Sequence, residues 1–165
     1  MREVWQWTEK QLDEIDAEAQ ALVDRYWDWH FQHNDRFTDW AEKSRLGVRV
    51  RRNKNGIAID WYVNRWVRRD RGMRTFSDHI ARGKGADGYP PGKLERYAQS
   101  EEEQEVVAQY EERFKALRRR VRKLATLRQE LRKYAKEIGC EDEIDRWAQE
   151  GLEAWKEQRQ VGAST

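Results

Sequence analysis

The chain has 165 residues, of which 39% are charged and only 38% belong to the hydrophobic set. Nine Trp, six Tyr and four Phe nevertheless argue against disorder, so we expect one elongated domain over residues 1–165 with a thin core and long helices. A single cysteine excludes an internal disulfide, and we find neither a stretch of about 18 apolar residues nor the apolar segment of a secretory signal, so we expect a cytoplasmic protein that does not enter a membrane.

The net charge of +2 conceals a segregation of charge along the chain. Residues 1–42 carry 4 basic and 11 acidic groups, whereas residues 43–98 carry 15 basic and 5 acidic groups. Residues 99–165 are nearly balanced, but within them residues 113–136 hold 11 basic groups and a single acidic one. Basic blocks of this size are typical of proteins that bind a polyanion.

Apolar residues spaced alternately three and four apart predict a first helix over residues 8–43. The apolar seam runs from Leu12 through Tyr26 to Trp40. Thr8 starts the helix in a capping-box pattern, in which a hydroxyl accepts from a free backbone amide of the first turn. The two tryptophans that precede Thr8 are expected to fold back onto this helix.

The apolar period then changes to two, which predicts a β-hairpin over residues 46–67. Val48 and Val50 alternate with arginines on one side of an Asn55-Gly56 turn, and residues 57–63 alternate on the other side. Asn-Gly between two alternating runs is the strongest short signal for a hairpin. Glycines and prolines dominate residues 68–92, which we predict to be mostly loop; a helical turn or a third strand at residues 75–82 is the exception that we keep open.

A long basic helix is predicted over residues 93–138. Ser100 and Glu103 form a second capping pattern, so we expect a kink or break in this helix near Gln99. Gly139 is placed to end the helix as the residue after its C-terminus. A third helix is expected over residues 142–158, with its apolar residues on one side.

These elements predict an α+β, mostly helical fold. The two long helices are expected to form an antiparallel, coiled-coil-like helical hairpin, with the β-hairpin inserted between them and the short C-terminal helix after them. Their near-equal lengths favour pairing within one chain, which gives a monomer. A coiled-coil homodimer is the alternative, because four heptads are enough for it.

Patterns that carry enzymatic or metal chemistry are weak. Gly83 to Gly88 match G-x-G-x-x-G, but no parallel strand precedes them, as a dinucleotide site requires. His30 and His33 lack further ligands, and His33 lies on the apolar seam, which indicates packing. His79 has no nucleophile beside it. We therefore predict no catalytic residue, no metal site and no cofactor, and a protein that is not an enzyme.

The basic segments are the most informative feature and predict contact with nucleic acid. A two-stranded ribbon fits the major groove of B-DNA, and the planar arginine fork suits both phosphates and guanine edges. The predicted contact residues are Arg49, Arg51, Arg52, Lys54, Arg65, Arg68, Arg69, Arg71, Arg74, Arg82 and Lys84. A second basic face is predicted on the long helix at Arg119, Arg120, Arg122 and Lys123, although part of its charge is expected to face the acidic first helix.

Several of these segments resemble a known family. Residues 59–64 (IDWYVN), residues 77–80 (SDHI), the Gly/Tyr loop and the basic helix are similar to MobI-type conjugative transfer proteins of integrative conjugative elements and conjugative plasmids, over about residues 45–138. The resemblance implies an auxiliary factor that binds the transfer origin of the DNA and helps the relaxase, the nicking enzyme, to initiate mobilisation. It implies no catalytic residues.

Two other functions remain open at the level of the sequence. A protein-interaction scaffold of a mobile element would use exposed Trp27, Trp147 or Trp155 as anchors, since large aromatics dominate interface energetics. An RNA-binding protein would use the same basic hairpin, with Tyr62 and Trp66 stacking on unpaired bases.

Overall fold

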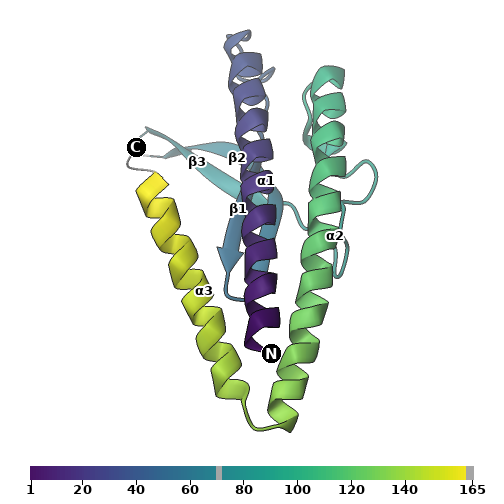
Figure 1. Ribbon diagram of the computed structural model, residues 1–165. Coiled ribbons are helices and arrows are strands. Elements are labelled where there is room, and N and C mark those ends of the chain that lie inside the picture. The colour runs from purple at the N-terminus through teal and green to yellow at the C-terminus, as the bar shows by residue number, and fades with distance from the viewer. Residues whose placement is uncertain (70–71, 163–165) are drawn as a thin grey trace. The chain divides into compact units, whose positions relative to one another are not determined.

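The computed structural model describes residues 1–69 and 72–162. In chain order its elements are α1 (Arg2–Asp35), β1 (Leu46–Asn53), β2 (Gly56–Arg69), β3 (Gly72–His79), the short 3-10 helix η1 (Glu95–Tyr97), α2 (Glu101–Glu137) and α3 (Glu141–Gly162) (Figure 1). The predicted α+β, mainly helical class is confirmed. The coiled-coil-like helical hairpin stays a prediction.

The chain divides into two compact units. The first comprises Met1–Glu18, Arg51–Ala58 and Arg119–Thr165, and the second comprises Ala19–Val50 and Ile59–Arg118. Helices α1 and α2 and strands β1 and β2 therefore contribute residues to both. That the two units make one elongated domain stays a prediction.

The first unit is built around Trp5 at the start of α1. Trp5 is buried with Ala135 of α2 and with Ile144 and Trp147 of α3. Helix α3 runs back from the end of α2 after a tight turn at Gly139, whose φ of 73° is the left-handed conformation expected of a residue that ends a helix (Figure 1). Trp147 is thus a core residue and offers no exposed anchor to a partner.

The second unit is built around aromatic rings from three elements. Tyr26 of α1 makes edge-on contacts with Trp61 of β2, at 5.0 Å between ring centroids, and with Tyr110 of α2, at 5.5 Å. Phe114 of α2 also packs against Trp61, with 5.9 Å between ring centroids. The hydroxyl of Tyr26 donates to the carbonyl of Leu46 at 2.9 Å, so the most buried tyrosine keeps a hydrogen-bond partner.

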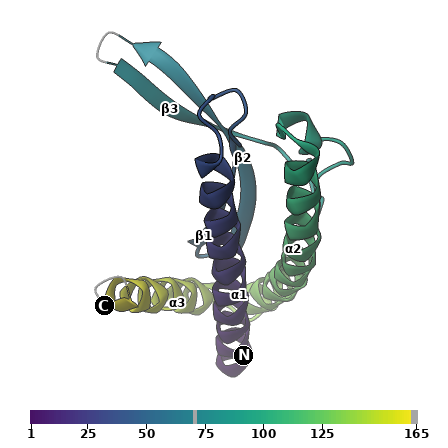
Figure 2. The same ribbon diagram turned by 90° about the horizontal axis from the view of Figure 1, so that it is seen from above.

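A third strand extends the predicted hairpin into a three-stranded sheet of order β1-β2-β3. β2 and β3 pair antiparallel from Tyr62↔His79 to Arg69↔Gly72. The segment 68–92, predicted to be mostly loop, is therefore a strand in its first part. The reason is that β2 has 14 residues and β1 only 8, so the far end of β2 extends past β1 and pairs with β3. Figure 2 shows these two strands running on together past the end of β1.

The first helix starts and ends earlier than predicted. Thr8 does not cap it, because the Thr8 hydroxyl donates to the carbonyl of Trp5 at 2.7 Å inside the helix. At the other end, Asn34 accepts a hydrogen bond from the amide of Ser44 at 2.7 Å and donates to its carbonyl at 3.2 Å. These two bonds reverse the chain, so that Trp40 lies in a loop and not on the helical seam.

The predicted break near Gln99 is confirmed. Helix α2 starts after Ser100, whose hydroxyl accepts from the amide of Glu103 at 3.1 Å, while the Glu103 carboxylate accepts from the amide of Gln99 at 2.6 Å. This reciprocal pair is a capping box. The residues from 93 to 100, predicted as the start of the same helix, form only η1 and turns.

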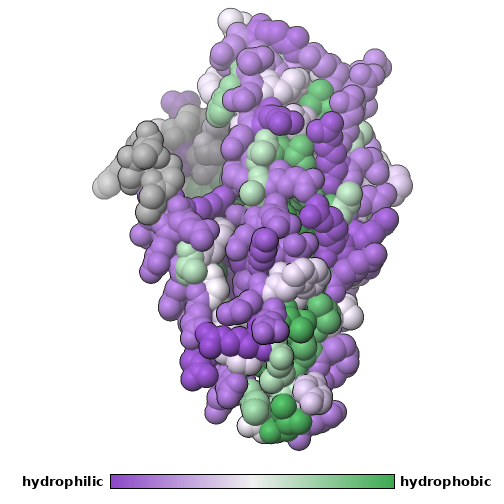
Figure 3. All heavy atoms as spheres, viewed as in Figure 1, coloured by the Kyte–Doolittle hydropathy of each residue, from purple (hydrophilic) through white to green (hydrophobic). Residues whose placement is uncertain are grey.

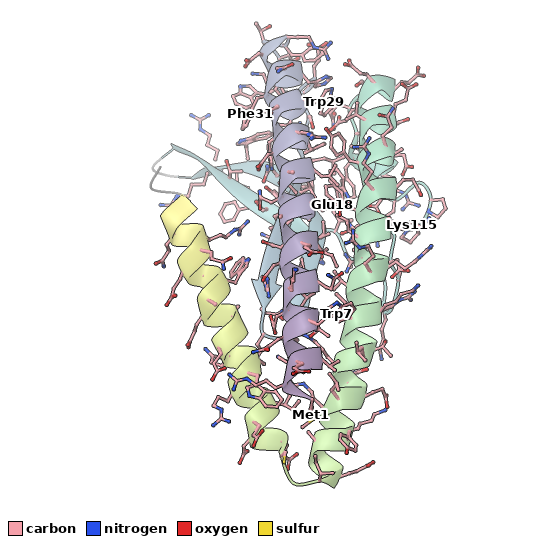
Figure 4. All side chains as sticks on the ribbon, viewed as in Figure 1. Met1, Trp7, Glu18, Trp29, Phe31 and Lys115 are labelled. Carbon is pink, nitrogen blue, oxygen red and sulfur yellow. The ribbon has the colours of Figure 1, made fainter. Side chains whose placement is uncertain are left out.

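The surface drawn in Figure 3 is mainly hydrophilic, as 39% charged residues require. Hydrophobic residues gather on it where α1 begins and α2 ends, inside the first unit. Figure 4 shows two aromatic residues of α1, both in the second unit, on different sides of the helix. Trp29 points to the side of α2, whereas Phe31 points away from α2 and is 60% exposed.

Candidate nucleic-acid interface

The paired ends of β2 and β3 form a ribbon with exposed arginines. We call residues Tyr62–Arg69 of β2 and Gly72–His79 of β3 the basic ribbon. Arg65, Arg68 and Arg74 are all exposed on it. Arg74 is paired with Val67 across the strands, so it shares one face of the ribbon with Arg65, whereas Arg68 projects from the other face.

Charge on the basic ribbon is only partly neutralised. Arg65 donates through both Nε and Nη2 to the carboxylate of Asp78, and these hydrogen bonds lower the pKa of Asp78. Within residues 1–69 and 72–162, no ion pair is found for Arg68 or Arg74. Among the described side chains of the ribbon, Arg68 and Arg74 are therefore the cations available to a ligand, and Arg65 is held in place by its neighbour across the strands.

The predicted contact residues nearer the β1-β2 turn divide into exposed and enclosed side chains. Arg51 and Lys54 are exposed. Arg49 is half-buried, with its guanidinium 5.1 Å from the ring centroid of Tyr62. Arg52 has a side chain only 2% exposed, because it pairs with the carboxylates of Glu9, at 2.7 Å, and Asp13.

Two predicted contact residues lie in the loop after β3, and one of them is half-buried. Arg82 donates to the carbonyl of Ile59 at 2.7 Å and lies 3.5 Å from Asp60, so it fastens the loop to β2. Lys84 is exposed. Two further predicted residues, Arg69 and Arg71, have side chains outside the described part of the structure.

The second basic face lies on α2 in the first unit. Arg119, Arg122 and Lys123 are exposed, and Arg120 pairs with Glu18 of α1 at 2.6 Å. This ion pair bears out, for one residue, the expectation that part of this charge faces the acidic first helix.

A cavity of about 530 Å³ brings together residues from the two predicted basic groups. Lys54 and Asn55 of the β1-β2 turn line it with Arg122, Arg128 and Arg132 of α2. Arg128 is buried here: it donates to Thr8 at 2.9 Å, pairs with Glu9, and lies 4.4 Å from the ring centroid of Trp5. Arg128 thus supports the first unit from inside, whereas Lys54 and Arg122 are exposed at its surface.

Sequence reasoning missed a second cavity of about 530 Å³, at the base of the basic ribbon. It is lined by Trp40, Arg45, Arg65, Trp66 and Val67. The rings of Trp40 and Trp66 meet in an edge-on contact, 5.1 Å between centroids. The helical periodicity assigned Trp40 to the seam of the first helix and so masked this cavity, whereas the chain reverses because the Asn34 side chain bonds the backbone amide and carbonyl of Ser44.

Tyr62, predicted to stack on unpaired bases, has a different environment. It is half-buried between the guanidinium of Arg49 and the backbone at Gly47, and a Cβ added at Gly47 would lie 2.5 Å from the Tyr62 Cζ. Gly47 therefore makes room for this ring. Burial raises the pKa of Tyr62.

Histidines do not form a metal site within the described ranges, where no group of three or more His, Cys, Asp or Glu side chains is placed to hold an ion. His33 is 2% exposed and stacks on Trp29 at 4.8 Å, as its place on the seam predicted. His30 is also buried, and burial lowers its pKa to about 4. Among the described residues, no helix is long and apolar enough to cross a membrane.

The fold and the ribbon define a helical α+β protein with a basic β-surface. A model of the MobI protein family matches residues 15–132 of the chain. The match covers most of the sequence, so the chain belongs to the MobI family, as its motifs predicted. Comparison with curated proteins and with solved structures found no significant match.

Membership of this family implies a role in mobilisation, the conjugative transfer of DNA. It is a family of accessory mobilisation proteins and not a known enzyme family. The matched residues include the second half of α1, the whole sheet and most of α2, which are the elements that carry the basic ribbon and the second basic face.

Proposed function

We propose that this protein binds DNA at the transfer origin through its basic ribbon and, as an accessory factor, helps the relaxase to initiate mobilisation. The observation that carries the proposal is the pair Arg68 and Arg74, exposed on a two-stranded ribbon and without an ion pair to any described residue. A ribbon of two strands is narrow enough for the major groove of B-DNA. Arginine is the side chain that serves both phosphates and guanine edges there.

The distribution of acidic residues favours the ribbon as the DNA-binding surface over the other predicted contact residues. Residues 62–84 hold seven basic side chains and two aspartates, one of which is Asp78, paired with Arg65. In contrast, Arg52 and Arg82 have their guanidinium groups engaged by protein acceptors. The proposal therefore assigns DNA contact to the exposed residues and assigns Arg52 and Arg82 to the support of the fold.

Exposed cations on α2 supply a second contact in this proposal. Arg119, Arg122 and Lys123 present positive charge to solvent, and Lys54 is exposed in the same unit. Lysine and arginine at such positions bind phosphates without reading sequence. Their removal should lower the affinity for DNA of every sequence by the same factor. Removal of ribbon residues that reach base edges should instead reduce the preference for the origin sequence.

Binding of one origin duplex by three proteins tests the proposal. A labelled duplex from the transfer origin is bound by the wild type, by Arg68→Ala/Arg74→Ala, and by Lys10→Ala/Arg25→Ala, a matched pair that removes two exposed cations from α1. We expect the ribbon pair to lose at least about tenfold in affinity, by about 1 kcal/mol per contact, and the α1 pair to bind like the wild type. Equal affinities for all three proteins would refute the assignment to the ribbon.

A further inference from the structure

The cavity at the base of the basic ribbon is lined by the aromatic rings of Trp40 and Trp66, and the binding of a duplex does not require such rings. We infer that Trp40 and Trp66 stack on unpaired bases of DNA, so that the protein holds a single-stranded segment beside the duplex on its ribbon. This inference rests on the proposed function and names its second substrate class. The cavity of about 530 Å³ lies within the range of ordinary ligand sites.

The exposure of Trp40 is the first step of the argument. Trp40 is 60% exposed in the loop after α1, although an indole ring is among the largest apolar surfaces that a side chain can bury. Its contact with Trp66 is edge-on, with an angle of 60° between the ring planes. Two rings that meet at such an angle form a corner with apolar walls, which suits a flat heteroaromatic ring.

The charges around Trp40 and Trp66 indicate that the ligand's aromatic ring is attached to negatively charged groups. The Nζ atom of Lys43 lies 4.8 Å from the ring centroid of Trp40, and the guanidinium carbon of Arg45 lies 5.7 Å from that of Trp66. Arg45 and Arg65 both line the cavity, and no carboxylate is among its described lining residues. Asp39 and Glu42 lie in the same loop as Trp40 but outside this lining.

Aromatic rings interleaved with cations fit a nucleic-acid strand better than a protein partner. Bases stack on indole rings while Arg and Lys hold the phosphates on either side, and this stacking accepts any base because every base has a π-face. Bases inside a duplex are already stacked on each other and present only their edges. The cavity therefore selects an unpaired strand, and the ribbon that extends from Trp66 carries the duplex-binding arginines Arg68 and Arg74.

A comparison of oligonucleotides with and without bases tests the inference. The probes are a labelled 12-residue oligo-dT and a 12-residue abasic DNA of equal charge, measured by fluorescence anisotropy at one salt concentration. The wild type should prefer oligo-dT by about 5- to 100-fold, the range for one stacked base. Trp40→Ala/Trp66→Ala should lose most of this preference, and Trp66→Phe, which keeps a ring, should retain part of it.

Trp7→Ala is the matched control, because Trp7 is half exposed at the start of α1 (Figure 4) and belongs to the first unit. It should keep the full preference, and Trp7→Ala and Trp40→Ala, which both change residues outside the basic ribbon, should bind duplex DNA as the wild type does. Equal binding of oligo-dT and abasic DNA by the wild type, or an unchanged preference in Trp40→Ala alone and in the double variant, would overturn the inference while duplex binding upholds the proposed function.

Two further outcomes separate the inference from the proposal on which it rests. A preference for oligo-dT that the tryptophan variants lose, together with no duplex binding, would uphold the stacking site and refute the ribbon as a duplex reader. Tighter binding of oligo-rU than of oligo-dT by the wild type would assign the cavity to RNA and overturn the inference.

Discussion

Arg128 shows how a residue from the basic helix serves the fold and not a ligand. Its side chain is 5% exposed, donates to the hydroxyl of Thr8 at 2.9 Å and pairs with Glu9, which is itself 15% exposed. A guanidinium enclosed in this way stabilises its unit only while its partners remain, because an unpaired buried charge is costly. Removal of Arg128 would therefore take this partner away from both Thr8 and Glu9.

We therefore expect Arg128→Ala to lower the free energy of unfolding by about 3 kcal/mol. The matched control is Arg132→Ala, one turn further along α2, where the side chain is 34% exposed and pairs with the exposed Asp145. Removal of such a surface pair should cost less than about 1 kcal/mol. Urea denaturation followed by circular dichroism measures both, and equal stabilities of the two variants would contradict the structural role of Arg128.

His30 gives the fold a dependence on pH. The ring is buried beside Trp27, with 4.7 Å between centroids, and its Nε2 lies 3.1 Å from the amide nitrogen of Asn34. Burial first, and the neighbouring His33 second, lower the pKa of His30 from 6.5 to about 4. Between these two values the unfolded chain binds a proton that the folded chain does not, so the unfolded state gains stability as the pH falls.

The contribution of His30 to stability is thus complete above pH about 6.5 and is lost progressively as the pH falls toward 4. We expect the wild type to lose up to about 3 kcal/mol over this window from this group alone. His30→Gln cannot be protonated, so the difference in stability between wild type and variant should change by that amount between pH 7 and pH 4.5. A difference that stays constant with pH would show that His30 does not titrate in this way.

At the scale of the element, the start of α2 depends on a capping box. Ser100 accepts from the amide of Glu103, and the carboxylate of Glu103, which is fully buried, accepts from the amide of Gln99 and from the hydroxyl of Ser44. The cap therefore joins the helix start to the loop that follows α1. Because these bonds hold Gln99 and Ser100 outside the helix, α2 does not extend back into residues 93–99.

Ser100→Ala removes the oxygen that accepts the Glu103 amide and should destabilise the protein by about 1 kcal/mol. Ser100→Asp keeps an acceptor at the same position, and we expect its stability to stay within a few tenths of a kcal/mol of the wild type. Thermal unfolding of the three proteins under one set of conditions compares them. Equal loss in both variants would show that the hydroxyl does not act as the cap.

The same capping box was readable in the sequence, whereas the start of α1 was not. The local hydrogen bonds between Ser100, Glu103 and Gln99 form as the pattern predicts, and the distant contact from Ser44 to the Glu103 carboxylate adds to them without replacing them. Thr8 has the same local pattern with Gln11, but a tertiary contact wins: Arg128, far along the chain, donates to the Thr8 hydroxyl. Local periodicity cannot foresee a partner so distant in sequence.

The basic ribbon shows the same division between local and distant information. Alternation and the Asn55-Gly56 turn were enough to predict β1 and β2, and Asn53 closes that turn by accepting from the amides of Asn55, at 2.9 Å, and Gly56, at 3.1 Å. β3 was open in the prediction because its sequence mixes polar and apolar residues without a clear period. It becomes a strand by pairing antiparallel with the far half of β2, a contact that its own sequence does not signal.

The candidate site was predictable as a set of cations and not as a surface. Arg51, Arg68 and Arg74 are exposed as a binding role requires, but Arg52 is enclosed by Glu9 and Asp13. Arg51 continues the arginine side of the alternation and Arg52 the side of Val48 and Val50, so the sequence separates their faces but does not identify the carboxylates that meet Arg52. Their fates differ because successive side chains of a strand point to opposite faces, and only one face meets the acidic start of α1.

At the scale of the whole molecule, the basic groups fall into two classes: those paired with carboxylates of α1 and those exposed on the basic ribbon. In the first unit, carboxylates of α1 neutralise enclosed or neighbouring arginines, as Glu9 does for Arg52 and Arg128, and Glu18 for Arg120. In the second unit, Arg68 and Arg74 of the basic ribbon have no ion pair with any residue that the structure describes. The acidic first helix is therefore a structural counter-charge for the fold, and the ribbon's surplus is what remains for a polyanion.

The most direct test of this account is the salt dependence of binding to the origin duplex. The logarithm of the association constant, plotted against the logarithm of salt concentration, falls by about 0.9 for each phosphate contact on duplex DNA. We expect a slope of roughly −5 to −7 for the wild type, from about six to eight contacts, and a slope shallower by about 2 for Arg68→Ala/Arg74→Ala. A slope near zero for the wild type, or an identical slope for the two proteins, would contradict DNA binding by the ribbon.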